Sequence, residues 1–286
     1  MINEYVCTDL AAECPLEGAQ GVRFSQSTQD RIELSRIEIL DERGEKALGK
    51  PRGCYVTLSF PGAFSLSDDQ HARLCAMLAE QIKQMLGDAR TVLVVGLGNR
   101  RITADAVGPM TVDRITVTRH LQTLDPSLFQ KVGQRSVAAM VPGVLGDTGM
   151  ESADLVAAAV RTVKPDAVIA LDALAARSVD RLCCTVQLSD SGIEPGGGVG
   201  NRRMALSHKT LGVPVLALGV PTVVNSATLV RDALEKAGIS RYENELRQVL
   251  ENGRSFFVTP KESDAAANAM ADLLALALDM ALEAAG

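Results

Sequence analysis

The chain has 286 residues, of which 47% are hydrophobic and only 3% aromatic, so the sequence predicts a well-buried core of alanine, valine and leucine. This length allows one large domain or two small ones. The formal net charge of −6 argues against direct nucleic-acid binding, which requires a basic face, but it is compatible with a protein substrate that itself sits on DNA.

The first half of the chain begins with an irregular, polar stretch over residues 1–20 that contains no basic and apolar leader, so no signal peptide is predicted. Residues 31–40 alternate as a half-buried strand, and residues 54–60 return as its partner after a turn at 41–44, which predicts a small antiparallel addition. The later elements are expected, in chain order, as a helix at 67–86, a strand at 91–95, a helix at 104–121, a strand at 135–141, a helix at 151–163, strands at 166–171, 182–188 and 213–220, helices at 225–237 and 240–252, a short strand at 255–259 and a helix from Ser263 to about Ala285.

Alternating strands and helices predict an α/β fold with a doubly wound, mostly parallel sheet flanked by helices, and the antiparallel pair forms an N-terminal addition to it. The final helix is the most apolar one, but Asp272 and Asp279 interrupt it, so it is not expected to cross a membrane. The six cysteines show no Cys-x-x-Cys spacing and are read as reduced, mostly structural thiols.

Two aspartates follow the apolar strands at 91–95 and 166–171 and are the main candidates for catalysis. Asp105 comes after the first of these strands and Asp172 after the second. Ligands of open α/β sheets bind outside the carboxyl ends of the strands, so both side chains are expected to face one crevice. Two close carboxylates do not both ionise cheaply, and such a pair can hold one proton while its other member acts as a base.

Simpler interpretations of the same residues remain open. An aspartate after a strand often caps the next helix. The glycine loop at 96–99 could instead cradle a phosphate, which would make the chain a non-enzymatic nucleotide-binding module, but Arg101 stands where the dinucleotide fingerprint requires its third glycine. Asp190 and Glu194 could contact a metal, yet no third ligand is spaced to complete a site, so no metal and no cofactor are expected.

Glycine-rich loops at 142–149 and 190–203 would let a substrate backbone approach the crevice closely. Together with the loop at 96–99 they supply the candidates for substrate binding and for stabilising an oxyanion through backbone N–H groups. These candidates are Gly96, Gly98, Asn99, Gly143, Gly198 and Gly200.

The chain resembles the germination protease family, the spore endopeptidases of endospore-forming bacteria, in a series of short stretches that run in order along most of its length. These stretches are residues 5–13, 96–99, 103–109, 117–121, 142–146, 170–177, 189–193, 198–201, 211–214, 219–223 and 258–262. The chain departs from the family pattern in a shorter segment between Val224 and Phe256 and in Cys7, where the family commonly has arginine.

This resemblance implies an intracellular endopeptidase, cytoplasmic in the spore interior, that degrades small acid-soluble spore proteins during germination. It implies a homotetramer made as a zymogen that cuts its own N-terminus, an atypical aspartic mechanism with Asp105 and Asp172 as the catalytic pair, and a fold related to the hydrogenase maturation proteases. Neither a nucleic acid nor a membrane is expected as a direct partner.

The segment from Thr8 to Glu13 resembles both the processing site and the substrate site of that family. We therefore expect cleavage between Asp9 and Leu10, with residues 1–9 as a propeptide and residues 10–286 as a single protease domain. Leu10 would fill an apolar pocket, whereas Asp9 requires a compensating partner if it is to be buried. A metal-dependent endopeptidase of the maturation type remains the alternative enzyme, in which the same carboxylates recognise a metal centre.

Overall fold

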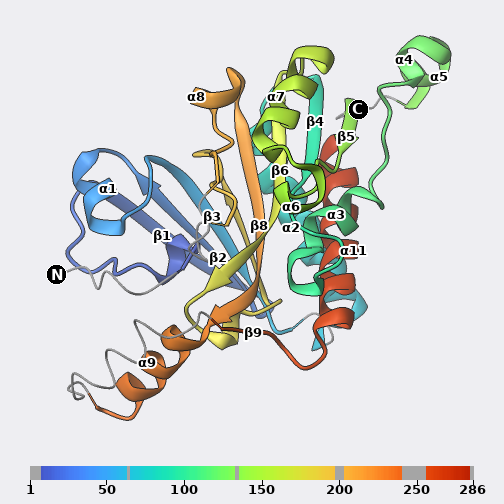
Figure 1. Cartoon of the computed structure of the whole chain (residues 1–286). Coiled ribbons are helices and arrows are strands. Elements are labelled where there is room, and N and C mark those ends of the chain that lie inside the picture. The colour runs from blue at the N-terminus through green and yellow to red at the C-terminus, as the bar shows by residue number, and fades with distance from the viewer. Residues whose placement is uncertain (1–7, 63–64, 133–134, 197–202, 240–255, 284–286) are drawn as a thin grey trace.

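The computed structural model describes residues 8–62, 65–132, 135–196, 203–239 and 256–283, and they form one sheet with helices on both faces (Figure 1). The described strands lie in the order β1-β2-β3-β7-β8-β6-β4-β5, and β9 pairs with β8. The strands are β1 (Val22–Gln29), β2 (Ile32–Ile39), β3 (Gly53–Ser59), β4 (Thr91–Gly96), β5 (Ser136–Met140), β6 (Ala167–Ala176), β7 (Thr185–Ser189), β8 (Val215–Asn225) and β9 (Phe257–Val258). The main helices are α1 (Glu42–Leu48), α2 (Asp68–Leu86), α3 (Val107–Val112), α4 (Leu121–Leu124), α5 (Pro126–Val132), α6 (Leu145–Thr148), α7 (Ser152–Val163), α8 (His208–Leu211), α9 (Ser226–Lys236) and α11 (Ser263–Leu282).

The sheet has a parallel half and an antiparallel half. Strands β5, β4, β6 and β8 pair in parallel, while β7, β3, β2 and β1 continue the sheet in antiparallel pairs. This arrangement confirms the α/β fold class and the antiparallel N-terminal addition. The antiparallel share is larger than the sequence predicts, because β7 joins it and because β1 is almost entirely exposed and carries no hydrophobic alternation by which it could be recognised.

Two apolar layers cover the two faces of the sheet. Helices α2, α3 and α11 pack on one face over the odd-numbered core residues of β6, such as Ile169 and Leu171. Helix α7 packs on the other face over Val168 and Ala170. The period of two along a strand sends neighbouring side chains to opposite faces, which is why a strand with both faces covered reads as a continuous apolar run.

Helix α11 is long and apolar enough to cross a membrane by length and composition, but 61% of its most apolar stretch is buried inside this structure. Two of its acidic residues, Asp272 and Asp279, meet polar partners of the chain. Asp272 forms an ion pair with Arg114, and Asp279 accepts hydrogen bonds from the amide and hydroxyl of Thr116. In this structure α11 therefore packs against the sheet as part of the hydrophobic core.

Strands β6 and β8 are longer than predicted, which changes the position of the second aspartate. We expected this strand at residues 166–171 with Asp172 directly after it, but β6 continues to Ala176 and pairs there with β8. Strand β8, expected at 213–220, likewise continues to Asn225. Asp172 consequently lies within β6 and is paired with Gly219 of β8.

Two helical regions differ from expectation. The helix predicted over 104–121 ends at Val112, because the β-branched residues that follow favour extended backbone and the amide of Thr118 donates to the carbonyl of Val137. The turn predicted at 41–44 is the start of α1, which Asp41 caps by accepting from two backbone amides. The helix expected at 240–252 lies outside the described residues.

Candidate functional site

Asp105 is held next to the end of β4 by the glycine loop at 96–99. It closes the short 3-10 helix Thr103–Asp105, and the amide of Asn99 donates to its Oδ2 at 2.8 Å. Gly98 has a φ of +111°, and a Cβ there would lie 2.0 Å from the carbonyl oxygen of Asp105, so only glycine fits this position. Burial raises the pKa of Asp105 to about 6 although the Asn99 hydrogen bond opposes the shift.

Asp172 is a buried carboxyl in the interior of β6. Its exposed fraction is 6%, and the amide of Ala173 donates to its Oδ1 at 2.9 Å. Burial raises the pKa of Asp172 well above its ordinary value, and the negative charges of Asp105 and Asp9 raise it further. The two predicted carboxylates thus lie close enough to interact, and burial together with the charge of Asp105 favours the protonated form of Asp172.

Asp105 and Asp172 line one open cavity of about 1940 Å³, together with Asp9. Strand register places another residue, Gln187, on the floor of this cavity: Gly219 of β8 pairs with Asp172 on one side and with Gln187 of β7 on the other. Residues paired across neighbouring strands project to the same face, so Asp172 and Gln187 face the same space, with a residue that has no side chain between them.

The N-terminal segment crosses this face of the sheet. The amide of Asp9 donates to the carbonyl of Ala175, and the amide of Ala175 donates to the Asp9 carboxylate, both at 2.8 Å. The Gln187 side chain contacts the two peptide groups that flank Leu10: its Nε2 donates to the carbonyl oxygen of Asp9 at 3.1 Å, and its Oε1 accepts from the amide of Ala11 at 2.7 Å. The bond between Asp9 and Leu10 is therefore fixed by a side chain that shares its face with Asp172.

Leu10 fills an apolar pocket, as the sequence predicts. Its side chain is fully buried. Its neighbours are Leu174, Ala176, Leu182 and Val224. A Cβ on Gly219 would lie 2.4 Å from Leu174, so the absence of a side chain at Gly219 makes room for the wall of this pocket.

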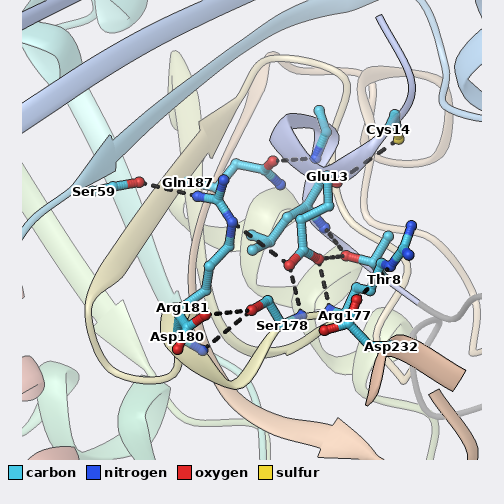
Figure 2. A network of polar contacts seen from close by, with 12 residues as sticks. Thr8, Glu13, Cys14, Ser59, Arg177, Ser178, Asp180, Arg181, Gln187 and Asp232 are labelled. Atoms are coloured by element: carbon cyan, nitrogen blue, oxygen red, sulfur yellow. Dashed lines mark hydrogen bonds and ion pairs between the residues drawn. The ribbon is translucent and has the colours of Figure 1, made fainter. Parts of the chain in front are cut away.

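Glu13 anchors the other end of the segment. Figure 2 shows its carboxylate surrounded by donors from the segment after β6. The amide of Arg177 donates to Oε2 at 2.7 Å, the amide of Ser178 donates to Oε1 at 2.9 Å, and Nε of Arg181 lies 3.6 Å from Oε1 (Figure 2). The hydroxyl of Thr8 also donates to this carboxylate.

The other predicted site residues take several positions. Gly98 and Asn99 line the cavity, whereas Gly96 does not and instead allows α3 to approach, since a Cβ there would meet the carbonyl of Gly108 at 2.5 Å. Gly143 lies outside the cavity lining, although the neighbouring residues 144–146 are part of it. Gly198 and Gly200 lie outside the described residues.

The geometry gives little support to the metal-dependent and the nucleotide-binding interpretations. Within the described ranges, no three histidine, cysteine, aspartate or glutamate side chains are grouped so that they could hold a metal ion. Asp190, considered as a metal ligand from sequence, accepts a hydrogen bond from the amide of Cys54 at 2.7 Å. The glycine loop at 96–99 directs the amide of Asn99 at Asp105, which occupies the place where a cradled phosphate would sit.

Gln187 and Arg181 belong to the site, but the sequence did not reveal them. Neither residue lies in a recognisable motif, and β7, with the sequence Thr-Val-Gln-Leu-Ser, is short and partly polar. The signal that could have found Gln187 is a long amide side chain between two apolar residues of a predicted buried strand, where burial of an amide without a partner would be costly. Chemically, the site combines two carboxyl groups, both with raised pKa values, with a glutamine side chain that contacts the carbonyl of Asp9.

Comparisons with known proteins show what the chain is similar to. The sequence model of a family described as germination protease matches residues 6–248 of the chain. A germination protease of Caldanaerobacter subterraneus subsp. tengcongensis is 41% identical over 287 residues, covering 92% of this chain and 88% of that protein. A germination protease of Clostridium acetobutylicum is 36% identical over 312 residues, covering 97% of this chain and 95% of that protein. Among solved structures, a NiFe hydrogenase maturation protease from Thermococcus kodakarensis is similar with a TM-score of 0.37 and 16% identity, over 69% of this chain and 98% of that one.

Proposed function

Because the chain belongs to the germination protease family and is therefore a peptidase with a role in spore germination, we propose that it starts the degradation of small acid-soluble spore proteins through an aspartic mechanism. The observation that carries this proposal is the shared cavity of Asp105, Asp172 and the peptide bond after Asp9. In this proposal the chain is a zymogen: residues 1–9 are a propeptide, residues 10–286 are the protease domain, and the chain cuts itself between Asp9 and Leu10.

The different surroundings of Asp105 and Asp172, which raise their pKa values to different extents, support a division of roles between the two carboxyl groups. Asp105, with a pKa of about 6, is ionised at neutral pH and accepts a proton from the attacking water. Asp172, whose pKa is raised well above its ordinary value by burial and by the charge of Asp105, is the member of the pair that carries a proton and donates it to the carbonyl oxygen or to the leaving amine. Water adds to the Asp9 carbonyl carbon, the C–N bond breaks, and the products are a carboxylate on Asp9 and an amine on Leu10.

Gln187 supplies a donor at the oxygen where negative charge develops. Its Nε2 already contacts the carbonyl of Asp9 in the uncut chain, and a fixed donor at that position stabilises the tetrahedral intermediate. The amides of the glycine loop at 96–99 remain further candidates for this role. The assembly state and location follow the family resemblance: a homotetramer in the cytoplasm of the spore, with spore proteins as substrates and neither nucleic acid nor membrane as a direct partner.

Substitution of either carboxyl tests the proposed chemistry. Asp105→Asn and Asp172→Asn each remove a group that must change its protonation state, so both variants are expected to lose self-processing and cleavage of a small acid-soluble spore protein by at least about 10²-fold. N-terminal sequencing follows the processing, and circular dichroism checks the fold. Near-wild-type cleavage by either variant with an unchanged spectrum would remove the carboxyl pair from the mechanism.

A further inference from the structure

The carboxylate of Glu13 occupies a site built from groups outside the N-terminal segment. The side chain of Glu13 is only 5% exposed. Two consecutive amides, those of Arg177 and Ser178, donate to its two oxygens, and the Arg181 guanidinium supplies the opposite charge. A buried carboxylate is costly unless it is paired and hydrogen-bonded, and here both conditions are met.

The receiving groups are held in place independently of Glu13. Nη1 of Arg181 donates to the hydroxyl of Ser59 on β3 at 3.1 Å, which orients the guanidinium from the far side (Figure 2). Arg177 and Ser178 follow directly after β6, so the end of the strand fixes the direction of their amides. Ser178 also accepts from the amide of Asp180 through its side chain, which closes the turn.

We propose that the amides of Arg177 and Ser178 and the guanidinium of Arg181 form a carboxylate-binding subsite that determines specificity. It holds Glu13 before processing, and in the mature enzyme it binds an acidic side chain of a protein substrate at the fourth residue after the cut bond. The inference rests on the proposed function, because the count of four residues starts from cleavage between Asp9 and Leu10.

Cleavage itself frees the subsite for a substrate. The hydroxyl of Thr8 donates to Glu13 and accepts from the amide of Leu10 at 3.1 Å, and Lys50 holds the carbonyl of Thr8 at 2.9 Å. The cut separates Thr8 from the rest of the segment. It also creates an ammonium group on Leu10, whose side chain is buried in an apolar cluster, and a charge placed there is unfavourable. Residues 10–13 therefore leave, and the pocket and the subsite become available together.

Two peptides test the subsite in the processed wild-type protein. Both carry residues 5–16 of this chain with Cys7→Ser and Cys14→Ser, and one of them also carries Glu13→Gln. We expect the glutamate peptide to be cut with a kcat/KM at least about tenfold higher, because glutamine carries no negative charge and has only one acceptor oxygen for the two amides of the subsite. The full-length chain with Glu13→Gln should mature more slowly than wild type by a similar factor.

An arginine pair provides the matched variants. Arg181→Met should reduce the preference for the glutamate peptide to less than about twofold. Arg177→Met is the control, since the Arg177 side chain pairs with Asp232 and Glu235 while its amide, which contacts Glu13, is retained. That variant should keep the preference. A melting curve shows whether each variant is folded, and the wild-type comparison of peptides needs neither variant.

The outcomes separate the inference from the function on which it rests. Equal cleavage of the two peptides by the wild-type protein, or maturation of the Glu13→Gln chain at the wild-type rate, overturns the subsite while the protease remains. A chain that neither matures nor cuts a small acid-soluble spore protein overturns the proposed function itself. Loss of the preference in Arg177→Met as well as in Arg181→Met would assign the effect to general disturbance of the turn and would also count against the subsite.

Discussion

At the scale of single residues, the site depends on two carboxyl groups of the same type in different surroundings. Asp105 lies at the rim of the cavity and receives a hydrogen bond from Asn99, while Asp172 lies inside the sheet and feels the negative charge of Asp105. Burial raises the pKa of Asp105 to about 6, and it raises the pKa of Asp172 well above its ordinary value. In the proposed mechanism, environment and not residue type separates the base from the acid.

Replacement of Asp172 with asparagine should stabilise the fold at neutral pH. A raised folded-state pKa means that the folded protein binds a proton more tightly than the unfolded chain, so wild-type stability falls as pH rises from about 4 through the folded pKa. Asp172→Asn lacks this penalty and is expected to be about 1–3 kcal/mol more stable than wild type at pH 7, with no difference near pH 4. Thermal melts at both pH values measure this, as a rise in Tm of roughly 2–8 °C at pH 7.

The exposed Asp154, in the first turn of α7, provides the control for that comparison. Asp154→Asn should change the stability by less than about 0.5 kcal/mol at either pH, as surface substitutions usually do. If Asp172→Asn lowered the Tm at pH 7 relative to wild type, the carboxyl would be stabilised as an anion in the folded state and its assignment as the proton donor would be wrong.

Loss of the Gln187 amide should slow the cut without unfolding the sheet. Gln187→Met keeps the volume but removes the donor to the Asp9 carbonyl, and we expect maturation to slow by about 10²-fold, as for other donors at a developing oxyanion. The control is Thr185→Val on the same strand, because the buried hydroxyl of Thr185 has no hydrogen-bond partner among the described residues. Single-turnover processing rates of the two variants give the comparison, and equal rates would remove Gln187 from the mechanism.

At the scale of elements, the N-terminal segment behaves as a short additional strand laid on the end of β6. Backbone hydrogen bonds to Ala175 fix its register, the pocket around Leu10 fixes its depth, and the contacts of Glu13 fix its far end. The long pairing of β6 with β8 is what makes this possible, since the segment docks on the part of β6 that extends beyond Asp172. Three separate sets of contacts thus hold the segment that contains the bond between Asp9 and Leu10.

A charge at Leu10 should prevent processing. Leu10→Lys would place an ammonium group in a pocket that has no exposed surface, so the segment should leave its site and the bond after Asp9 should stay uncut. Glu17→Lys, at an exposed position after the segment, introduces the same residue and should leave processing unchanged. Mass spectrometry of both proteins after incubation detects the cut. A normally matured Leu10→Lys chain, or a mature N-terminus other than Leu10, would contradict the assignment of the cleavage site.

At the scale of the whole molecule, the sheet joins a parallel half, which carries Asp172 and leads to Asp105, to an antiparallel half, which carries Gln187 (Figure 1). The cavity lies where β8 connects the two halves, and Gly219 of β8 pairs with both sides. The anchors of the N-terminal segment are likewise shared between the halves, through β6 and through Ser59 of β3, which holds Arg181. The site therefore requires the complete sheet.

Removal of metal ions should leave the peptidase active. The described part of the chain brings no group of metal-binding side chains together, and the proposed chemistry needs only the two carboxyls and water. We expect full cleavage of a spore protein after exhaustive dialysis against a chelator, measured beside an untreated sample. Loss of activity that one particular divalent ion restores would favour the metal-dependent alternative.

The sequence by itself determined the α/β class, the two catalytic candidates, the resemblance to germination proteases and the apolar surroundings expected for Leu10. These features are local: they follow from hydrophobic periodicity and from residues that lie close together in the chain. Hydrophobic patterning could not show that β6 extends past Asp172 or that β1 exists, because the first depends on pairing with β8 and the second is a polar, exposed strand.

Only the tertiary structure decided which distant residues complete the site. Gln187 and Arg181 lie in no recognisable sequence motif. Their roles arise from register across β6, β8 and β7 and from a turn that meets Glu13, 165 residues away from Ser178. The different roles of Asp105 and Asp172 were also beyond the sequence, because desolvation and the charge of a neighbour exist only after folding has buried one carboxyl beside the other.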